Sequence, residues 1–353
     1  MNRTDVFLKQ ISRREIDAAL IENTENLRYL SGFFGDSSQA LVSPETCLLF
    51  TDFRYIEQAE KEVESFEIIK TTGAERLSAI ANAVSGLKVK NLGVEADISH
   101  RRFMEYNDRL KTQKYTDISP DVQALRAVKS KEEQTYIRAA SKIVDRAFSH
   151  MIKTIRSGMS EKDVLAELVY FLYRHSEGLA FDPIVASGEN GALPHARPTG
   201  RTIGPGDFLT MDFGCIINGY CSDFTRTIAI GNVDSTQKKV YDVVRKAQAA
   251  AIDAVRAGIS ARALDETARG MIAEAGYREC FEHGLGHGVG LNVHENPVIN
   301  PASKDVLKAG MAITIEPGIY IKGCTGVRIE DLCIVQDDGA DVLTESQKDL
   351  VII

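Results

Sequence analysis

The stretches MIKTIRSGMS (151–160) and AIDAVRAGIS (251–260) carry Ile, Arg, Gly and Ser at the same four offsets, one hundred residues apart. In both, a helical segment leads to a glycine, and a serine of the type that caps helices opens another helix, with β-rich sequence after it. Chance similarity of two amphipathic helices is the alternative explanation. A true duplication predicts two β-hairpin layers that face each other with helices outside, and a site between them that takes side chains from both halves.

The helix that leads into the first stretch is marked at its start by Ser130 and Glu133, which have the spacing of a capping box. Its apolar residues recur with helical period, which predicts packing along its length. These residues are Ile137, Ala140, Val144, Ala147, Phe148, Met151, Ile152 and Ile155. Turn-rich sequence at 119–121 precedes the helix, so we place a domain boundary near residue 125.

Upstream of this boundary, short β-rich runs alternate with helical stretches, which predicts a compact α/β domain. The β-rich runs include 18–21, 39–42, 47–51 and 91–94, and one helical stretch is 54–63. A chain of 353 residues can bury a core in each of two domains. We expect domains at 1–125 and 126–353.

The chain has 50 Asp and Glu residues against 42 Lys and Arg residues, with no long run of either sign. No face is therefore expected to attract phosphate backbones or anionic lipid, and neither nucleic acid nor a membrane is an expected partner. The first 15 residues lack the apolar core of a signal peptide, and no apolar run is long enough to span a bilayer. The sequence predicts a soluble cytoplasmic protein.

Two acidic residues lie in TMDFG (210–214) and GYCSDFTRT (219–227), which are β-rich and joined by an Asn-Gly pair, a strong hairpin signal. With this pair at the turn, Asp212 lies opposite Thr225, and Asp223 lies on the same sheet face as Asp212, about 7–8 Å away along the diagonal. Two like charges in an apolar setting need a cation or a shared proton. Two solvated strand carboxylates are the alternative, which the apolar neighbours weaken.

The segment EHGLGHGVG (282–290) is rich in glycine, which argues against a helix although His283 and His287 are four residues apart. We expect a shaped loop that presents imidazoles. Four of the seven histidines fall between positions 195 and 294, namely His195, His283, His287 and His294. A lone histidine is more often structural, but this clustering favours a functional role.

Glu316 ends an apolar run in TIEPGIY (314–320), and the proline after it blocks continuation of a central ladder. In GVRIEDLC (326–333), Arg328 and Glu330 share one face of an alternating strand. A surface Arg–Glu pair is the alternative for this strand, but its other residues are too apolar for an exposed edge.

Four carboxylates and one imidazole form an oxygen-rich donor set suited to Mn²⁺, Co²⁺, Fe²⁺ or Zn²⁺, and unlike a thiolate zinc site. The number of carboxylates favours two dications over one. Paired metals hold a bridging water, lower its pKa and polarise a carbonyl or phosphoryl group. The pattern predicts hydrolysis of an amide or a phosphoester, and the extra histidines favour acyl chemistry.

The motifs LPHARP, TMDFG, GYCSDFTRT, EHGLGHGVG, VHENP, TIEPGIY and GVRIED occur in the order and approximate spacing of the pita-bread metallopeptidases. The resemblance spans residues 131–353. The preceding domain, with NLRYLSGF (26–33) and TDFRY (51–55), resembles the creatinase-type N-terminal domain of proline-specific aminopeptidases and prolidases. The resemblance implies an α+β chain, in which a smaller α/β domain precedes a pita-bread (creatinase/aminopeptidase) fold with an internal pseudo-twofold repeat.

The resemblance further implies that the metal ligands are Asp212, Asp223, His287, Glu316 and Glu330, all of which match the family motifs. Asp223 and Glu330 would bridge two divalent ions. Mn²⁺ is the first expectation, with Co²⁺, Zn²⁺ or Fe²⁺ as alternatives. Glu316 would also accept the proton of the bridging water.

Five further residues receive roles from the resemblance. His294 would hydrogen-bond the scissile carbonyl and stabilise the oxyanion, while His195 and His283 would line the side that receives the proline and the leaving portion. Arg328 and Tyr320 would orient ligands or the intermediate. The chain contains no tryptophan, so an indole that some relatives use near the entrance is missing.

The first expectation is an Xaa-Pro aminopeptidase, which hydrolyses the N-terminal Xaa-Pro bond through a metal-bridging hydroxide. A prolidase, which requires an Xaa-Pro dipeptide, is the nearest alternative. A creatinase-like amidinohydrolase without metal and a non-catalytic binding module are others, and retention of all five ligand positions argues against both. The expected partners are a peptide with proline at its second position and a second copy of the chain in a homodimer.

Overall fold

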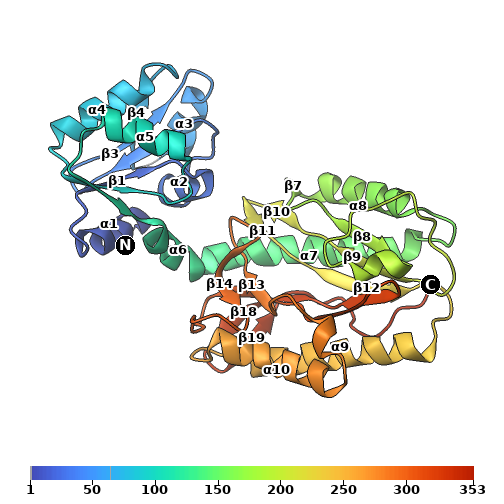
Figure 1. Cartoon of the computed structure of the whole chain (residues 1–353). Helices are drawn as coiled ribbons and strands as arrows, with labels where there is room; N and C mark the ends of the chain where they lie inside the picture. Colours follow the sequence, from blue (N-terminus) through green and yellow to red (C-terminus); the bar gives the residue numbers. More distant parts are fainter. Residues whose placement is uncertain (1, 64) are drawn as a thin grey trace. The chain divides into compact units, whose positions relative to one another are not determined.

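The computed structural model describes residues 2–63 and 65–353. The chain divides into two compact units, and it passes from the first to the second between Arg126 and Ala127. Figure 1 colours the first unit blue to teal and the second green to red. Each unit has a hydrophobic core of its own.

The first unit contains a mixed six-stranded sheet with the strand order β4-β3-β2-β1-β5-β6 (Figure 1). β1 runs antiparallel to β2 and parallel to β5. Every residue of β1, β2 and β5 is buried, as expected for central strands. The elements are α1 Arg3–Ser12, β1 Ala18–Ile21, α2 Thr24–Ser31, β2 Gln39–Val42, β3 Cys47–Thr51, α3 Ile56–Glu62, β4 Glu67–Lys70, α4 Arg76–Gly86, β5 Asn91–Val94, α5 His100–Arg109, β6 Lys114–Asp117 and α6 Ser119–Ala127.

The strands predicted at 18–21, 39–42, 47–51 and 91–94 are confirmed. The helix predicted at 54–63 is α3, which begins only at Ile56. The residues before Ile56 form a turn instead. In this turn, the Asp52 carboxylate accepts hydrogen bonds from the backbone N–H and the side chain of Arg54, at 3.1 and 2.9 Å.

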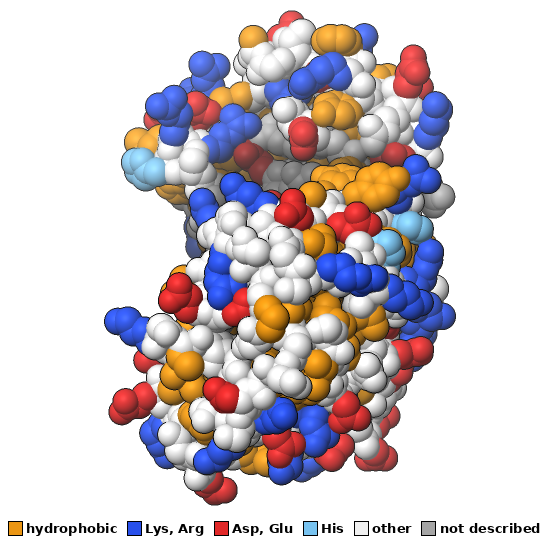
Figure 2. All heavy atoms as spheres, turned by 90° about the vertical axis from the view of Figure 1, so that its right-hand side faces the viewer, with side chains coloured by type: hydrophobic (Ala, Val, Ile, Leu, Met, Phe, Trp, Pro, Cys, Tyr) orange, Lys and Arg blue, Asp and Glu red, His pale blue; other side chains and the backbone are white. Residues whose placement is uncertain are grey.

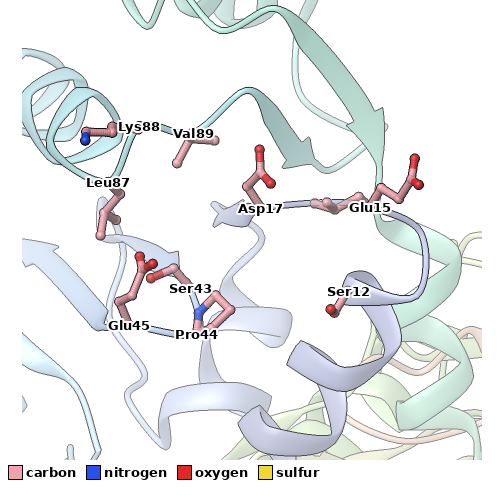
Figure 3. A pocket seen from close by; sticks show the side chains of 10 residues that line it. Ser12, Glu15, Asp17, Ser43, Pro44, Glu45, Leu87, Lys88 and Val89 are labelled. Atoms are coloured by element: carbon pink, nitrogen blue, oxygen red, sulfur yellow. The ribbon is translucent and has the colours of Figure 1, made fainter.

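A pocket of about 260 Å³ lies in the first unit, beside the end of α1, the turn between β2 and β3, and the end of α4 (Figure 3). Glu15, Asp17, Glu45 and Lys88 are among its lining residues. Asp17 already accepts two backbone N–H groups at 2.8 Å. The pocket contains none of the residues proposed as metal ligands, all of which belong to the second unit.

In the second unit, helices α7 and α8 pack against one group of strands and helices α9 and α10 against another (Figure 1). The elements of the first half are α7 Lys131–Thr154, α8 Glu161–His175, β7 Gly178–Leu179, β8 Ile184–Ser187, the short helix η1 Gly188–Ala192, β9 Phe208–Asp212, β10 Cys215–Ile217, β11 Tyr220–Cys221 and β12 Thr225–Ala229. Those of the second half are α9 Ser235–Ala254, α10 Ala261–Glu274, the short helix η2 Arg278–Cys280, β13 Gly286–Gly288, β14 Glu295–Ile299, β15 Ala312–Ile315, β16 Gly318–Ile321, β17 Thr325–Arg328, β18 Asp331–Gln336 and β19 Gly339–Val342.

The predicted duplication is confirmed by matching contacts in the two halves. Ser160 and Ser260 cap α8 and α10, and each side chain accepts a hydrogen bond from the backbone N–H three residues later. Gly158 and Gly258 have φ angles of 97° and 87°, and each donates its N–H to a carbonyl at 2.9 Å in the segment after its half's second helix. The two halves therefore place a helix pair on the outside in the same way.

The helix α7 begins as predicted, with a capping box between Ser130 and Glu133. The predicted apolar stripe packs into the core, with only Ile152 half-buried. This helix and α8 form the outer wall behind β8, β9 and β10.

Each half also contains a β-hairpin that is interrupted near its middle. In the first, the β9–β12 ladder ends before the β10–β11 ladder begins. In the second, β15 pairs with β18 and β16 pairs with β17, with a gap of two residues in each strand. Pro317 lies in this second gap, where its missing N–H prevents a continuous ladder, as predicted.

Acidic and basic side chains are interspersed over the face shown in Figure 2, and neither sign forms a broad field there. Of the helices in the described part of the chain, none is long and apolar enough to cross a membrane.

The backbone of β17 passes so close to η1 that only glycine fits at position 326. A Cβ there would lie 1.8 Å from the carbonyl oxygen of Gly191. We expect Gly326→Ala to lower the Tm of the second unit by about 4–8 °C, because such overlap costs roughly 2 kcal/mol and a domain of this size loses about 2–4 °C per kcal/mol. Gly339→Ala is the matched control, since a Cβ there meets no atom within 4 Å. Calorimetry that gave equal transitions for the two variants would contradict this packing.

Candidate metal centre

The first interrupted hairpin carries Asp212 and Asp223. Asp212 is the last residue of β9 and pairs with Thr225 of β12, which confirms the predicted register. Asp223 lies in the gap between β11 and β12 and is 4% exposed. The interruption therefore places one carboxylate at the end of a ladder and the other just outside it.

The second interrupted hairpin carries Glu316 and Glu330, which lie across its gap from each other. The sequence indicated one alternating strand over 326–333, and this was wrong, because β17 ends at Arg328 and β18 begins at Asp331. Pro317 in the opposite strand explains the break, since it cannot donate to the ladder. Arg328 and Glu330 are 4% and 1% exposed, so they are not a surface pair.

Several contacts join the two hairpins, and one of them holds Glu330. Thr225 and Glu330 form an isolated β-bridge, in which the Glu330 N–H donates to the Thr225 carbonyl at 3.1 Å. The Thr225 hydroxyl also donates to Oε2 of Glu330 at 2.6 Å. A carboxylate of the second half is thereby held against the hairpin of the first.

His287 reaches the same place from a strand. The segment 282–290 was expected to be a loop, but residues 286–288 form β13, which pairs with β14 and β15. The glycines are needed for close approach, because a Cβ on Gly286 would lie 2.1 Å from the carbonyl oxygen of Thr314 and one on Gly288 would lie 2.3 Å from that of Asn296. The prediction that the two histidines are not on a helix is confirmed.

Ligand atoms of Asp223, His287 and Glu330 lie within 4.8 Å of one another. His287 Nε2 is 3.5 Å from Oδ2 of Asp223 and 3.3 Å from Oε1 of Glu316. Asp212 is held differently, because its Oδ2 pairs with Arg328 at 2.5 Å. Within the described residues, Oδ1 of Asp212 and Oε1 of Glu330 are buried and have no hydrogen-bond partner.

The charges in this cluster perturb one another. Burial, followed by the neighbouring carboxylates, raises the pKa of Asp223 and Glu330 well above the usual range. Burial disfavours the charged form of His287, but the hydrogen bond to Glu316 and the charges of Glu316 and Asp223 outweigh it and raise its pKa to about 9. Burial likewise opposes ionisation of Glu316, yet His287 lowers its pKa to about 2. Without a cation, protons supply part of the missing positive charge.

These residues fit divalent cations. Burying an uncompensated carboxylate is costly, and two of the buried carboxylate oxygens have no partner in the described chain. Carboxylates with one imidazole are donors that divalent transition metals accept. The arrangement can therefore exchange its protons for metal ions.

Arg328 organises one side of the cluster. Besides Asp212, its guanidinium donates to the Tyr320 hydroxyl at 2.8 Å and to the carbonyl oxygen of Pro194 at 3.3 Å. The Tyr320 hydroxyl lies 3.0 Å from Nε2 of His283. The resemblance implied an orienting role for Arg328 and Tyr320, and they lie where such a role is possible.

The remaining two histidines lie at the edge of the cluster and are exposed. The ring of His294 is 4.3 Å from that of His287, between ring centres. His195 interacts electrostatically with both His283 and His294. Burial lowers the pKa of His283. At His294, which is exposed but whose ring is partly desolvated, that desolvation and then the charge of His287 lower the pKa, so both rings are favoured as neutral imidazoles that can donate or accept a hydrogen bond.

Four supporting residues were not identified from the sequence. Thr225 holds Glu330, and the Thr314 hydroxyl donates to Glu316 at 3.1 Å and accepts from the His287 N–H at 3.0 Å. Arg226 and Asp331, both buried, form an ion pair at 2.7 Å beside Glu330. Strand alternation could have found Thr314, which is two residues before Glu316 and on the same face. Arg226 and Asp331 meet only across the two hairpins.

Comparison with known proteins shows to which family the chain is related. Residues 135–337 match Metallopeptidase family M24, and residues 3–128 match the Creatinase/Prolidase N-terminal domain. An Xaa-Pro dipeptidase from Bacillus anthracis has a similar structure, with a TM-score of 0.96, 38% identity and coverage of 99% of both chains. An X-Pro aminopeptidase from Thermotoga maritima has a TM-score of 0.89 and 37% identity, and 97% of this chain and 100% of that chain are covered. An Xaa-Pro dipeptidase from Pyrococcus horikoshii is 35% identical over 98% of this chain and 97% of its own length.

These matches cover both units, and they agree with the fold that the resemblance implied, a creatinase-type domain followed by a pita-bread domain. The metal-compatible cluster lies within residues 135–337, the part that matches the metallopeptidases. The chain therefore belongs to metallopeptidase family M24, and it is an enzyme of the type that carries the creatinase/prolidase N-terminal domain.

Proposed function

We propose that this protein is a metal-dependent Xaa-Pro dipeptidase, a prolidase. The observation that carries the proposal is the buried cluster of carboxylates around His287, with two carboxylate oxygens unpartnered in the described chain. The sequence alone favoured an Xaa-Pro aminopeptidase. Several related proteins are named as dipeptidases, which favours the alternative.

We propose that five residues hold two divalent metal ions, namely Asp212, Asp223, His287, Glu316 and Glu330. Asp223 and Glu330, one from each half, would be shared between the two ions, since their ligand atoms and that of His287 lie within 4.8 Å of one another. When bound, the metals would supply an activated water and a Lewis acid for the peptide carbonyl. Manganese as the physiological metal stays a prediction.

The residues around the cluster would then handle the peptide. Glu316 lies within the cluster, with its Oε1 3.3 Å from Nε2 of His287, so its carboxylate would be available to accept a proton from the attacking water. A neutral His294 can donate a hydrogen bond to the carbonyl oxygen as negative charge develops on it. His195 and His283 would line the side on which proline binds, and Tyr320 and Arg328 would keep this side in place.

Proline at the second position suits such a site. An Xaa-Pro bond is a tertiary amide, so the leaving residue offers no N–H, and its ring has a fixed shape. Recognition must therefore come from shape and from the carbonyl or carboxylate groups. The homodimer implied by the resemblance stays a prediction.

An Xaa-Pro aminopeptidase is the second candidate, because the Thermotoga maritima protein of similar structure bears that name. Incubation with Ala-Pro, Ala-Pro-Ala and Ala-Pro amide, each with Mn²⁺ and with a chelator control, separates the two. We expect chelator-sensitive release of alanine from Ala-Pro, and release at least about 10-fold slower from the other two, because a dipeptidase requires the free proline carboxylate close to the scissile bond.

Mass spectrometry of the three reactions measures this. Equal or faster cleavage of Ala-Pro-Ala would replace the dipeptidase with the aminopeptidase. No cleavage of any of the three peptides would overturn both.

Substitution of single residues should separate the proposed metal ligands from residues that act only on the substrate. We expect Asp223→Asn to lower turnover by more than about 100-fold and to reduce bound metal, because an amide is a poorer metal ligand than a carboxylate. His294→Ala should also lower turnover about 100-fold, but with metal content unchanged. Asp253→Asn, on the exposed face of α9, is the control. Steady-state kinetics with elemental analysis checks all three, and full metal content in Asp223→Asn would remove this residue from the ligand set.

The metal-free protein should lose stability as the pH rises. The raised pKa of His287 gives stability that is fully present below pH about 6.5 and lost through about 9, and the raised pKa values of Asp223 and Glu330 act in the same direction above the ordinary carboxyl range. Metal replaces these protons, so its binding should tighten over the same range. We expect the Tm difference between Zn²⁺-loaded and metal-free protein to widen from pH 6 to pH 9. A constant difference would contradict this account.

A further inference from the structure

Two histidines near the cluster, His195 and His283, lie on loops rather than on strands. We name these the His195 loop (residues 188–199) and the His283 loop (residues 281–285). Each loop is anchored to the second helix of its own half, α8 for the first and α10 for the second. The anchors are buried carboxylates, Glu161 and Asp265, and both are 0% exposed.

Glu161 holds the two ends of the His195 loop together. Its Oε1 accepts hydrogen bonds from the N–H and hydroxyl of Ser187, at 2.7 and 2.8 Å. Its Oε2 accepts from the N–H and hydroxyl of Thr199, at 2.8 and 2.7 Å, and Asn190 donates to both oxygens. Every one of these partners is a donor, so the site requires an acceptor on both sides. Only a carboxylate provides that.

Asp265 holds the His283 loop through Arg269. The two residues form a two-bond pair along α10, at 2.7 and 2.8 Å. The other edge of the guanidinium donates to the carbonyl oxygens of Phe281 and His283, at 2.6 and 2.7 Å. Asp265 also accepts the N–H of Leu285 at 3.1 Å. One planar group thus makes four hydrogen bonds to the helix and the loop at once, one more than the three donors of a lysine ammonium allow.

Both loops are also connected to the side chain of Arg328. Its guanidinium donates to the carbonyl oxygen of Pro194, the residue before His195, and to the hydroxyl of Tyr320. Tyr320 in turn contacts the ring of His283. Each loop is therefore held from two directions, by its helix from outside and by Arg328 from the cluster, which contacts the backbone beside His195 and, through Tyr320, the ring of His283.

We propose that Glu161 and the Asp265–Arg269 pair are positioning residues, which set the places of His195 and His283 and thereby the fit of the proline portion of the substrate. This inference rests on the proposed function for its substrate. None of the three residues is among the proposed metal ligands, so their effect should fall on substrate binding rather than on metal content. Each half thus has a buried carboxylate on its second helix, although the two are not at equivalent positions, because the hundred-residue offset pairs Glu161 with Ala261 and Asp265 with Leu165.

Glu161→Gln tests the first anchor, because it turns one accepting oxygen into a donor that faces other donors. We expect KM for Ala-Pro to rise about 10-fold, kcat to change by less than about 3-fold, and metal content to stay at the wild-type value. Glu189→Gln is the matched control, since it makes the same change at an exposed position of the same loop. A purely structural role would lower the amount of active enzyme, and hence kcat, without changing KM.

Thr199→Val removes one hydrogen bond of the same contact from the loop side. It is the milder variant and serves as the test if Glu161→Gln does not fold. The helix N-terminus still holds the loop in this variant, because the Lys162 N–H donates to the carbonyl oxygen of Thr199 at 3.2 Å. If both variants act through one contact, the double variant should raise KM by less than the product of the single effects. An unchanged KM in Thr199→Val together with an unchanged KM in Glu161→Gln overturns the proposal for this loop.

Arg269→Lys tests the second anchor, because it keeps the charge beside Asp265 and loses the fork that reaches the loop. We again expect KM to rise about 10-fold with metal content unchanged. Arg262→Lys, exposed on the same helix, is the control. Equal KM values for the two lysine variants would overturn the proposal for Arg269.

A readout without substrate separates this inference from the proposed function. Metal-free protein labelled at histidine Cε1 gives one NMR resonance for each histidine, assigned by single His→Gln variants. We expect Glu161→Gln to shift or broaden the His195 resonance and to leave that of His283, and Arg269→Lys to do the reverse. If wild type cleaves none of the three peptides but these shifts occur, the proposed function fails and the positioning role stands. Unshifted resonances would overturn the positioning role whatever the activity.

Discussion

Repulsion between buried carboxylates is the constraint on which the second unit depends. Asp212, Asp223, Glu316 and Glu330 all lie in one small region, and two of their oxygens are unpartnered in the described chain. Such a group is unfavourable unless positive charge enters it. Arg328 supplies one permanent charge, and the raised pKa of His287 supplies another. The rest must come from protons or metal ions.

The fold brings these groups together by interrupting two hairpins at corresponding places. A continuous ladder would turn alternate side chains to opposite faces and leave the backbone fully paired. The gaps free Asp223, Glu316 and Glu330 from regular pairing, and the bridge between Thr225 and Glu330 fixes one hairpin against the other. Because each half contributes two carboxylates, neither half could form the cluster by itself. A duplicated chain is therefore suited to the proposed site for two metals.

The groups outside the cluster are also held by hydrogen bonds. Arg328 contacts Asp212, Tyr320 and the segment before His195, so it joins the carboxylates to the histidines that surround them. Outer helices hold the same loops from behind. For the proposed Xaa-Pro substrate, whose leaving residue has no N–H, such fixed geometry would replace hydrogen bonds that the substrate cannot make.

The sequence by itself determined the local features. The capping box at Ser130, the repeat at 151–160 and 251–260, and the opposition of Asp212 and Thr225 all follow from patterns within one element or one hairpin. The five candidate ligands could be selected because carboxylates and histidine in apolar, glycine-rich contexts are unusual. Each of these signals depends on residues close together in the chain.

Only the tertiary structure decided the features that depend on distant segments. His287 lies on a strand because Ile299 and Glu295 of β14 and Ile313 of β15 pair with the glycines beside it. The strand expected at 326–333 is broken because its neighbour contains a proline, and Thr225 became a partner of Glu330 through contact between hairpins about 100 residues apart. Periodicity within a segment shows which of its faces is apolar, but not which other segment will pack against that face. The energy of a buried charge depends on the groups that this packing brings next to it.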